Sequence, residues 1–368
     1  MKVALVHDWL DSRIGGAEEV FLTIAKLYPE ADVFTLLYNK KVYGARLTGR
    51  RIHVSYLRFF PKFFRKKLAL LLPFIKSAVR SHDLSGYDLV ISDSSAWSKN
   101  IRVPEGTMHI CYCHSPARMI WDSWPGYLDQ FSIARNKLIR FYLIWLVSKL
   151  RLWDFYASEG VDHFIANSHY IAARIKKFYG REAKVIYPPV QQPKSVSDQS
   201  QSAYWLVLST LARYKNIDVA IKAFIRSGRR LVVAGDGAAR SELEQLAQGH
   251  DNVEIIGRVD DAQKWQLLSG AQALLFANIE DFGITPVEAN MAGRPVVALR
   301  GGGVRESMVE AKTAIFFDEL AVEAINQAVS AADKTKWDKT VLRKNAARFA
   351  EEKFTKELQR YIREKCAQ

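Results

Sequence analysis

Short apolar runs alternate with amphipathic segments along the chain. The runs predicted as strands are 3–9, 33–38, 88–94, 108–114, 163–168 and 184–190, followed by 204–210, 230–237, 253–257, 273–278 and 295–300. Helices are predicted between them, among them 17–28, 169–179 and 216–227. Continuous apolar strands separated by helices are typical of parallel sheets with helices on both faces. The pattern therefore predicts an α/β protein.

One polar segment divides this pattern into two halves. Residues 191–202 are rich in Gln and Ser and contain a proline, so we interpret them as an interdomain linker. The predicted domains are 1–192 and 203–350, and the charged tail 338–368 is predicted to be helical. Ligands of open α/β sheets bind at the carboxyl ends of the strands, so we expect a cleft between the two such edges.

Composition narrows the class of protein. The 368 residues are 49% hydrophobic, no run approaches the roughly 18 apolar residues of a spanning helix, and His7 and Asp8 interrupt the first run. We therefore expect neither a membrane span nor a signal peptide. Three cysteines cannot form a disulfide framework and fit a reducing cytoplasm. The triplet from Cys111 to Cys113 and the adjacent His114 lack a second ligand pair, so no metal site is expected.

The net charge of +14 is unevenly distributed. No acidic residue occurs between Asp32 and Asp83, where twelve basic residues alternate with aromatic and aliphatic ones. A second acid-free stretch, 130–153, has the same mixture. Basic and aromatic residues together on a helix favour an anionic membrane surface. The alternatives are a solvated basic face and a nucleic-acid surface; we predict membrane contact and no nucleic-acid partner.

The most informative segment runs from Glu280 to Glu288. A predicted strand leads into it, Gly283 allows a turn, and a helix is predicted to begin at Thr285 and Pro286. Two carboxylates beside a helix N-terminus suit a polyhydroxyl, anionic ligand. An alternative is a capping box with Thr285 as N-cap and Glu288 at the third helical position, although that would leave Glu280 unexplained.

Other strand-to-helix loops carry further candidate residues. Gly15 and Gly16 follow the first strand, and 209–218 holds Arg213 and Lys215. Glycines 301–303 and Glu306 follow another predicted strand. His114 ends a strand ahead of a Ser-Pro turn, and Trp121 and Asp122 come soon after. Each also has a purely structural explanation. The glycines could form tight turns, Arg213 and Lys215 could lie in a surface loop, and His114 could be a buried histidine with its hydrogen bonds satisfied. Trp121 and Asp122 could serve packing and capping.

These stretches together resemble one family. Residues 280–288 resemble the E-x7-E motif of retaining glycosyltransferases of family 4, which have the GT-B fold. The loop 209–218 is similar to the diphosphate-clamping loop of that family. Lys215 stands at the family lysine and Thr210 at the family arginine, so Arg213 would have to supply the guanidinium. Residues 108–122 resemble the YxHsPxRxxWD segment of bacterial mannosyltransferases that build O-antigen and exopolysaccharide chains.

The resemblance implies a fold and a set of roles. The fold would be GT-B: two Rossmann-like domains facing each other across a cleft, with 351–368 crossing back to the N-terminal, acceptor-binding domain. The catalytic candidates are His114, Glu280 and Lys215. The donor-binding candidates are Gly15, Gly16, Thr210, Arg213, Lys215, Phe282, Gly283, Ile284, Thr285 and Glu288. Trp121 and Asp122 would lie on the acceptor side.

The implied activity is retaining transfer of a hexose, mannose from GDP-mannose, to a lipid-linked glycan in surface polysaccharide assembly. We expect a cytoplasmic protein bound peripherally to the inner face of the membrane. The chain has no Asp-x-Asp motif, so we expect no metal and no cofactor. Lys215, Arg213 and the N–H groups near Gly16 and Gly303 would stabilise the leaving diphosphate instead.

Two other functions remain open on the sequence. A sugar-nucleotide 2-epimerase shares the GT-B fold but has no lipid acceptor. A membrane or nucleic-acid binder without enzymatic activity would use the same positive charge, but would have no use for His114, Lys215 and Glu280.

Overall fold

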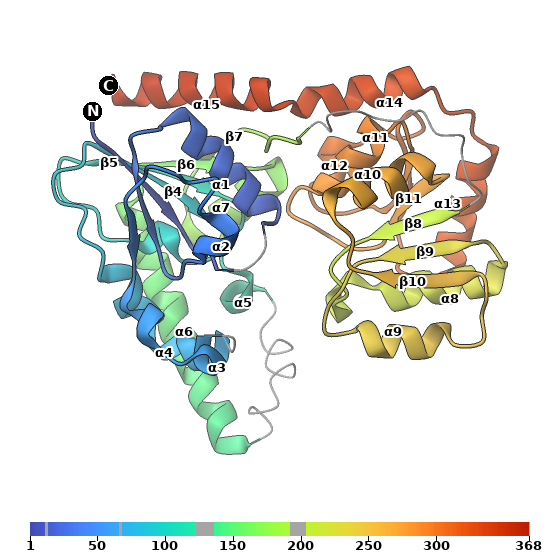
Figure 1. Cartoon of the computed structure of the whole chain (residues 1–368), viewed down its shortest axis with the longest axis horizontal. Coiled ribbons are helices and arrows are strands. Elements are labelled where there is room, and N and C mark those ends of the chain that lie inside the picture. The colour runs from blue at the N-terminus through green and yellow to red at the C-terminus, as the bar shows by residue number, and fades with distance from the viewer. Residues whose placement is uncertain (12–13, 66–67, 123–135, 192–203, 368) are drawn as a thin grey trace. The chain divides into compact units, whose positions relative to one another are not determined.

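The structure, a computed structural model, describes residues 1–11, 14–65, 68–122, 136–191 and 204–367. The chain forms two compact units. Unit 1 contains Met1–Tyr187 together with Phe354–Gln368, and unit 2 contains Pro188–Lys353 (Figure 1). Most of the linker predicted at 191–202 lies outside the described residues, as do Lys66, Lys67 and the first part of the 130–153 stretch.

Unit 1 is built on a parallel sheet with the strand order β3-β2-β1-β4-β5-β6-β7. Its strands are β1 (Val3–His7), β2 (Asp32–Thr35), β3 (Ile52–Val54), β4 (Leu89–Ser94), β5 (Met108–Cys113), β6 (His163–Ala166) and β7 (Ala183–Val185). The chain leaves β1 toward β2 on one side and leaves β4 toward β5 on the other. The carboxyl ends of β1 and β4 therefore form the switch point of this sheet, where ligands bind in open α/β folds.

Helices cover both faces of this sheet. They are α1 (Gly16–Leu27), α2 (Lys40–Tyr43), α3 (Lys62–Arg65), α4 (Leu68–Arg80), α5 (Arg118–Trp121), α6 (Lys137–Ala157), α7 (His169–Tyr179) and α15 (Glu351–Cys366), with 3-10 turns η1 (Tyr56–Phe59), η2 (Ser98–Asn100) and η5 (Ser158–Gly160). Successive residues of β1 alternate between two cores: Ala4 and Val6 pack with α4 and α6, whereas Val3 and Leu5 pack with α1 and α15. This two-sided burial explains why the strands are continuous apolar runs.

Unit 2 repeats the architecture with the parallel strand order β10-β9-β8-β11-β12-β13. Its strands are β8 (Trp205–Leu208), β9 (Leu231–Ala234), β10 (Val253–Gly257), β11 (Ala273–Phe276), β12 (Val296–Leu299) and β13 (Ala314–Phe317). Its helices are α8 (Ile217–Ser227), α9 (Arg240–Ala247), α10 (Asp261–Gly270), α11 (Ile284–Met291), α12 (Val304–Ser307), α13 (Val322–Lys334) and α14 (Lys339–Ala346), with turns η6 (Arg213–Lys215) and η7 (Ala347–Phe349). The switch point lies between β8 and β11, and α8 and α13 share one core with both strands.

The last helix folds with unit 1 although it follows unit 2 in the chain. Phe354, Leu358 and Ile362 of α15 recur on one side of the helix and are buried in the same core as α1, β1 and β4. Figure 1 shows α15, in red, lying along this unit. The α/β class and the parallel sheets predicted from the apolar pattern are confirmed, whereas edge strands β3 and β13 were not predicted.

Candidate functional site

The carboxyl edge of unit 2 brings two of the predicted catalytic residues together. Lys215, at the end of η6, forms an ion pair through its Nζ with Oε1 of Glu280, which follows β11. Lys215 is 12% exposed and Glu280 28% exposed, so both reach solvent from a half-buried position. This pair, separated by 65 residues in sequence, lies at the switch point between β8 and β11.

Two asparagines fix the geometry of this pair. Asn216, at the start of α8, has a positive φ of 55°, and its side-chain amide donates to the carbonyl of Ala277 at 3.1 Å. Asparagine tolerates this left-handed conformation better than most residues. Asn278 donates to Oε1 of Glu280 at 3.0 Å. The loop after β8 is thereby tied to the loop after β11, and Lys215 is held beside Glu280.

The start of α11 differs from the sequence-based expectation. The helix begins at Ile284, with Gly283 as N-cap at φ 85°. Thr285 therefore lies inside the first turn, and the capping box with Thr285 as N-cap is wrong, because Gly283 adopts a left-handed conformation and the helix starts two residues earlier. The N–H groups of Ile284 and Thr285 belong to the helix end that has no intrahelical acceptors. Phe282 is buried against the ring of Phe349, with ring centroids 5.2 Å apart, so its side chain anchors the loop.

Glu288 has a partner that the sequence did not reveal. Oε1 of Glu288 accepts a hydrogen bond from Nζ of Lys264 on α10 at 2.8 Å. Lys264 also approaches Asp261 at 3.4 Å. Burial lowers the pKa of Lys264, but the charge of Glu288 and its hydrogen bond outweigh burial and raise the pKa above its ordinary value. Glu288 is thus a paired carboxylate at the end of a short ionic cluster, and no local motif marks Lys264.

The other predicted donor-side residues of unit 2 are less closely associated with Lys215. Arg213 is 80% exposed and pairs with Glu242 of α9, its Nη2 lying 3.0 Å from Oε2 of Glu242. Thr210 is exposed near the start of the loop after β8. The N–H of Gly303 donates to the carbonyl of Glu280 at 3.0 Å and is therefore already occupied. A side chain at Gly302 would place Cβ 2.2 Å from the same carbonyl oxygen, so glycine there permits close packing of the two loops.

In unit 1 the glycine pair begins α1 as predicted. Gly16 is the first residue of the helix, and the N–H of Gly15 donates to Oε2 of Glu18 at 2.8 Å. Glu18 and Glu19 both lie in the first turn of α1. Carboxylates near a helix N-terminus interact favourably with its dipole and compete with an anionic ligand there. The predicted anion-binding turn therefore carries an internal carboxylate.

His114 directly follows β5 and lies in a buried cluster of ionisable groups. Its Nε2 is 3.0 Å from Oδ2 of Asp93 on β4, and Oδ1 of Asp93 is 2.8 Å from Nδ1 of His7 on β1. Neighbouring Asp8 accepts four backbone N–H groups, from residues 95–98, at 2.6–2.8 Å. His7, Asp8 and Asp93 were not predicted as site residues. The signal that could have marked them is their position at the ends of the two central strands.

The structure uses Trp121 and Asp122 for internal contacts. The indole N–H of Trp121 donates to Oδ2 of Asp154 at 2.7 Å, and its ring stacks on Phe178. Asp122 forms an ion pair with Arg174 of α7. Asp154 is fully buried and also pairs with Lys99. Packing, part of the alternative that the sequence left open, describes Trp121, whereas Asp122 is exposed and is held by its ion pair with Arg174.

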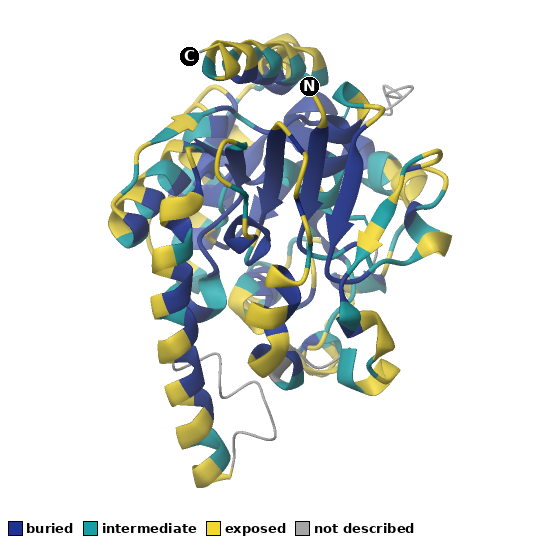
Figure 2. Ribbon diagram, turned by 90° about the vertical axis from the view of Figure 1, so that its left-hand side faces the viewer, coloured by how far each residue is buried: buried dark blue, intermediate teal, exposed yellow. Residues whose placement is uncertain are grey.

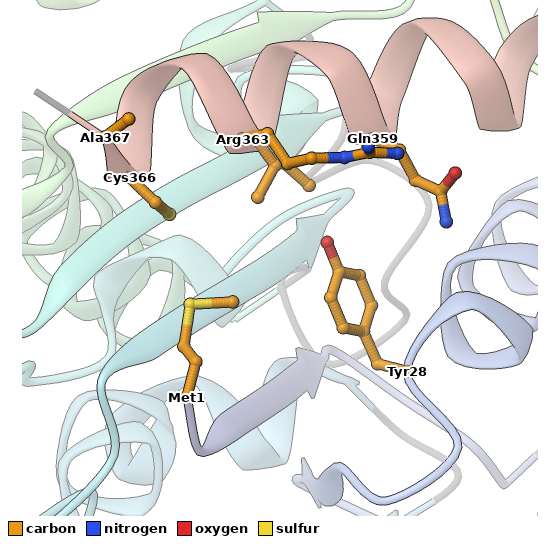
Figure 3. Close-up of a pocket in the computed structure, with 7 residues that line it drawn as sticks. Met1, Tyr28, Gln359, Arg363, Cys366 and Ala367 are labelled. Carbon is orange, nitrogen blue, oxygen red and sulfur yellow. The ribbon is translucent and has the colours of Figure 1, made fainter.

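A pocket of about 370 Å³ lies at the opposite, amino edge of the unit 1 sheet. It is lined by Met1, Tyr28, Gln359, Ile362, Arg363, Cys366 and Ala367 (Figure 3). Burial raises the pKa of Tyr28 to about 12 and also raises the pKa of the Cys366 thiol, so both stay protonated at neutral pH. The pocket belongs to the docking of α15 rather than to the strand ends that carry His7 and His114.

Helix α6 is apolar on two opposite faces. Leu143, Leu146, Val147, Leu150 and Trp153 are buried in the core shared with α4. The opposite face exposes a row of large side chains that we call the outer stripe: Leu138 (82% exposed), Phe141 (73%), Tyr142 (46%), Trp145 (50%), Leu152 (51%) and Tyr156 (58%). Figure 2 shows this long helix with buried residues along one side and exposed residues along the other. The lone acidic residue of α6, Asp154, is buried.

The basic stretch before Asp83 divides into internal and exposed residues. Arg50 donates to the carbonyl of Tyr28 at 2.7 Å and to that of Ala31 at 3.1 Å, beyond the end of α1. Arg51 is exposed and pairs with Asp32 at 3.2 Å. Arg58, Lys62, Lys76 and Arg80 are exposed around the aromatic side chains of η1, α3 and α4. Among the described residues no group of three or more His, Cys, Asp or Glu side chains is arranged to hold a metal ion. In the same part of the chain no helix combines the length and hydropathy required to span a membrane.

Two family models match consecutive parts of this chain. The model described as Glycosyltransferase Family 4 matches residues 14–192, and the one described as Glycosyl transferases group 1 matches 191–351. The chain belongs to glycosyltransferase family 4. Strands β2 to β13 and the switch point of unit 2 fall within the matched residues, whereas β1 precedes them. The protein is a glycosyltransferase.

Individual relatives agree with this membership. The α-1,3/1,6-mannosyltransferase ALG2 of Dictyostelium discoideum is 23% identical over 376 residues, which cover 85% of each chain. The lipopolysaccharide outer core galactosyltransferase WaaB superposes with a TM-score of 0.69 at 17% identity, covering 99% of this chain and all of the other. Anabaena HepE, solved in complex with UDP, superposes with a TM-score of 0.68 at 18% identity, with the same coverage. These likenesses confirm the predicted GT-B fold with its two Rossmann-like domains.

Proposed function

We propose that this glycosyltransferase transfers mannose from GDP-mannose, with retention of configuration, to a lipid-linked glycan used in surface polysaccharide assembly. The observation that carries the proposal is the Lys215–Glu280 pair beside the N-terminus of α11 in a family 4 chain. Lys215 and the N-terminus of α11 can bind the diphosphate of a sugar nucleotide. The carboxylates of Glu280 and Glu288 can bind the hydroxyl groups of its sugar and its ribose. Mannose is favoured because the relatives over most of the chain are mannosyltransferases by name.

The charges on the carboxyl edge of unit 2 define how the donor binds. Without donor, the ammonium of Lys215 is neutralised by Glu280. The diphosphate takes over Lys215 and the N–H groups of Ile284 and Thr285, because the diphosphate as a whole carries more negative charge than one carboxylate and matches the helix N-terminus. Glu280 is then released to accept hydrogen bonds from hydroxyl groups of the sugar. Glu288, held by Lys264, accepts the ribose hydroxyls.

The reaction places negative charge on the leaving diphosphate. Lys215 and the helix N-terminus stabilise that charge as it develops, which is the electrostatic contribution expected of fixed donors. We propose that no metal ion is needed, because these groups supply the compensating positive charge. Retention follows from attack on the same face that the diphosphate leaves, with no protein nucleophile assigned. Activity that is lost with EDTA and restored by Mn²⁺ or Mg²⁺ would contradict the metal-independent part of the proposal.

We also propose that unit 1 contacts an anionic membrane surface on the cytoplasmic side, where a lipid-linked acceptor is found. The outer stripe of α6 supports this, because six large side chains stand in solvent next to Lys137, Arg140 and Lys149. The exposed Phe59 and Phe63 beside Arg58 and Lys62 have the same composition. Helices with apolar residues on one side and basic residues beside them lie in the headgroup region of anionic bilayers.

The proposed donor can be tested with a panel of sugar nucleotides. GDP-mannose, UDP-glucose, UDP-galactose and UDP-N-acetylglucosamine are compared for thermal stabilisation and for slow hydrolysis without acceptor. We expect GDP-mannose to stabilise the protein most and to be hydrolysed with EDTA present. An epimerised sugar nucleotide as product would identify a 2-epimerase instead. If no donor binds, the remaining alternative is a membrane-binding protein without enzymatic activity.

A further inference from the structure

The pocket at the amino edge of the unit 1 sheet brings together three segments of the chain. Met1 precedes β1, Tyr28 follows α1, and the other lining residues lie on α15 or directly after it. Its volume of about 370 Å³ falls in the range of small-molecule sites. A water molecule takes up about 30 Å³ in the liquid, so the pocket has room for a ligand of about a dozen non-hydrogen atoms.

Most of the pocket wall is apolar. Ile362 is 2% exposed and connects the pocket to the core of unit 1. The side chains of Met1 and Ala367 and the ring of Tyr28 complete the apolar lining. Met1 is 71% exposed, so it has apolar surface that a ligand can remove from water. The wall therefore suits an apolar body.

The polar side chains of the pocket can all donate hydrogen bonds. Arg363 only donates, and the hydroxyl of Tyr28, the amide of Gln359 and the thiol of Cys366 can each donate as well. No carboxylate lines the pocket. In the described part of the chain, the side chains of Arg363, Gln359 and Tyr28 have no hydrogen-bond or ion-pair partner. Figure 3 shows the hydroxyl of Tyr28 directed toward α15, the helix that carries Gln359 and Arg363.

The charge of the pocket is positive. Burial raises the pKa of Tyr28 to about 12, Cys366 acts in the same direction and Arg363 opposes them, so these three groups are within electrostatic reach of one another. Burial also raises the pKa of the Cys366 thiol. At neutral pH Arg363 is therefore the one charged side chain of the seven, and the α-ammonium of Met1 is paired with Asp88 at 3.8 Å. One guanidinium surrounded by neutral donors matches a single anionic headgroup.

We propose that this pocket binds a small amphiphile with a carboxylate head and an apolar body. Arg363, Tyr28 and Gln359 donate to the carboxylate, and Met1 and Ile362 contact the body. The ligand touches both α15 and the segments that precede β1 and β2, so it stabilises the docked position of the last helix. The pocket shares no residue with the donor site of unit 2 or with the strand ends that carry His114, so this ligand is not the sugar nucleotide.

Cys366 provides a reporter inside the pocket. Cys111 and Cys113 are buried and Cys366 is exposed, so alkylation of the native, full-length protein by iodoacetamide measures access to Cys366. Octanoate is the probe. We expect it to slow alkylation of Cys366 saturably, with the modified site confirmed by mass spectrometry, and to raise the melting temperature, because it binds only the folded chain.

Octanol and octylammonium carry the same apolar body without the negative charge. The loss of a hydrogen bond to a charged group typically weakens binding by about tenfold or more, so both should need at least about tenfold higher concentrations for equal protection. Equal protection by octanol would overturn the assignment of an anionic headgroup, and absence of any protection by octanoate would overturn the site itself.

Two variants assign the binding to this pocket. Arg363→Gln should weaken octanoate binding by about tenfold or more. Gln359→Glu should abolish it, because the new carboxylate pairs with Arg363 and repels the ligand. Arg360→Gln, on the same helix and paired with Glu364, and Trp145→Glu, in the outer stripe, are controls that should bind like the wild type. Circular dichroism checks folding, and either pocket variant decides the matter if the other does not fold. Unchanged protection in the pocket variants would overturn the proposal.

Discussion

Two carboxylates of unit 1 that are almost completely buried are each matched by several partners. Asp8 is 1% exposed and is satisfied by four backbone N–H groups. Asp154 is satisfied by Lys99, Asn100, Trp121 and Tyr179. Such groups are costly to bury unless every lone pair is used, so both carboxylates organise loops rather than bind ligands. Glu280 and Glu288, in contrast, each have one lysine partner and retain solvent access.

Lys215→Ala should lower kcat by roughly 10²–10³-fold, since the loss of one charge-stabilising donor typically costs that much. Arg213→Ala is the matched control: its side chain is 80% exposed and paired with Glu242, so we expect activity close to wild type. Both variants are assayed with the preferred sugar nucleotide, and both should fold normally. A large loss in Arg213→Ala would show that this arginine leaves Glu242 and joins the clamp.

The stability of unit 1 should decrease as the pH falls from about 6.5 toward 4. His109 is fixed as one tautomer, because Nδ1–H donates to the carbonyl of Gly160 at 3.1 Å and Nε2 accepts from Ser92 at 2.8 Å. Burial lowers the pKa of His109 to about 4. The unfolded chain binds the proton first, so up to about 3 kcal/mol of the free energy of unfolding is lost across this window.

His109→Gln removes this titration and should flatten the dependence of urea-unfolding free energy on pH. The pKa of His82 is also lowered to about 4 by burial, so some slope should remain. Equal slopes in the wild type and the variant would show that His109 is protonated alike in both states.

At the scale of single helices and strands, burial explains which elements the apolar pattern predicted and which it missed. The central strands are continuous apolar runs because both of their faces are buried. The edge strand β3 has only three residues, none of them fully buried, and so lacks that signal. Helix α6 has the opposite property, with more apolar surface than its core can cover. Isolated exposed apolar residues are normal, but a continuous stripe of them marks an interaction surface.

Trp145→Glu should weaken binding to phosphatidylglycerol vesicles, because it puts an acid in the outer stripe next to anionic lipid. Val341→Glu, at an exposed apolar position in unit 2, is the control and should bind like the wild type. Vesicle co-sedimentation measures both. Binding should also weaken as salt rises, since the Debye length is only about 10 Å at 0.1 M.

Equal affinity for neutral vesicles, insensitive to salt and to Trp145→Glu, would mean that the stripe does not contact lipid. A concentration-dependent dimer that Trp145→Glu dissociates would identify a second copy of the chain as the occupant.

At the scale of the whole molecule, the two units share one architecture but use it differently. In each, the switch point of the sheet carries the candidate residues: His7, Asp93 and His114 in unit 1, and Lys215 and Glu280 in unit 2. The covalent order of the chain does not follow this division, because residues 354–368 complete the core of unit 1. The stability of unit 1 therefore depends on the last helix of the chain.

Leu358→Ala should destabilise unit 1 by about 2–5 kcal/mol, because Leu358 is fully buried against α1 and the sheet. Arg360→Ala, on the exposed side of α15, removes only a surface pair with Glu364 and should cost less than about 1 kcal/mol. Hydrogen–deuterium exchange distinguishes the units: peptides from β1 and α1 should exchange faster in Leu358→Ala, while those from β8 and α8 should not. Faster exchange in both units would contradict this division.

The apolar pattern alone determined the α/β class and most strands, because burial on both faces of a parallel sheet leaves a local record in the sequence. The family was indicated by the resemblance of residues 108–122, 209–218 and 280–288 to family 4 motifs. The same resemblance implied Lys215, Glu280 and His114 as catalytic candidates. Only the tertiary structure paired Lys264 with Glu288 and joined His7 to Asp93, which is 86 residues away. It also placed Arg50 at the end of α1 and Trp121 on Asp154. Ion pairs and hydrogen bonds between distant strands depend on which strand ends become neighbours, and no local pattern encodes that.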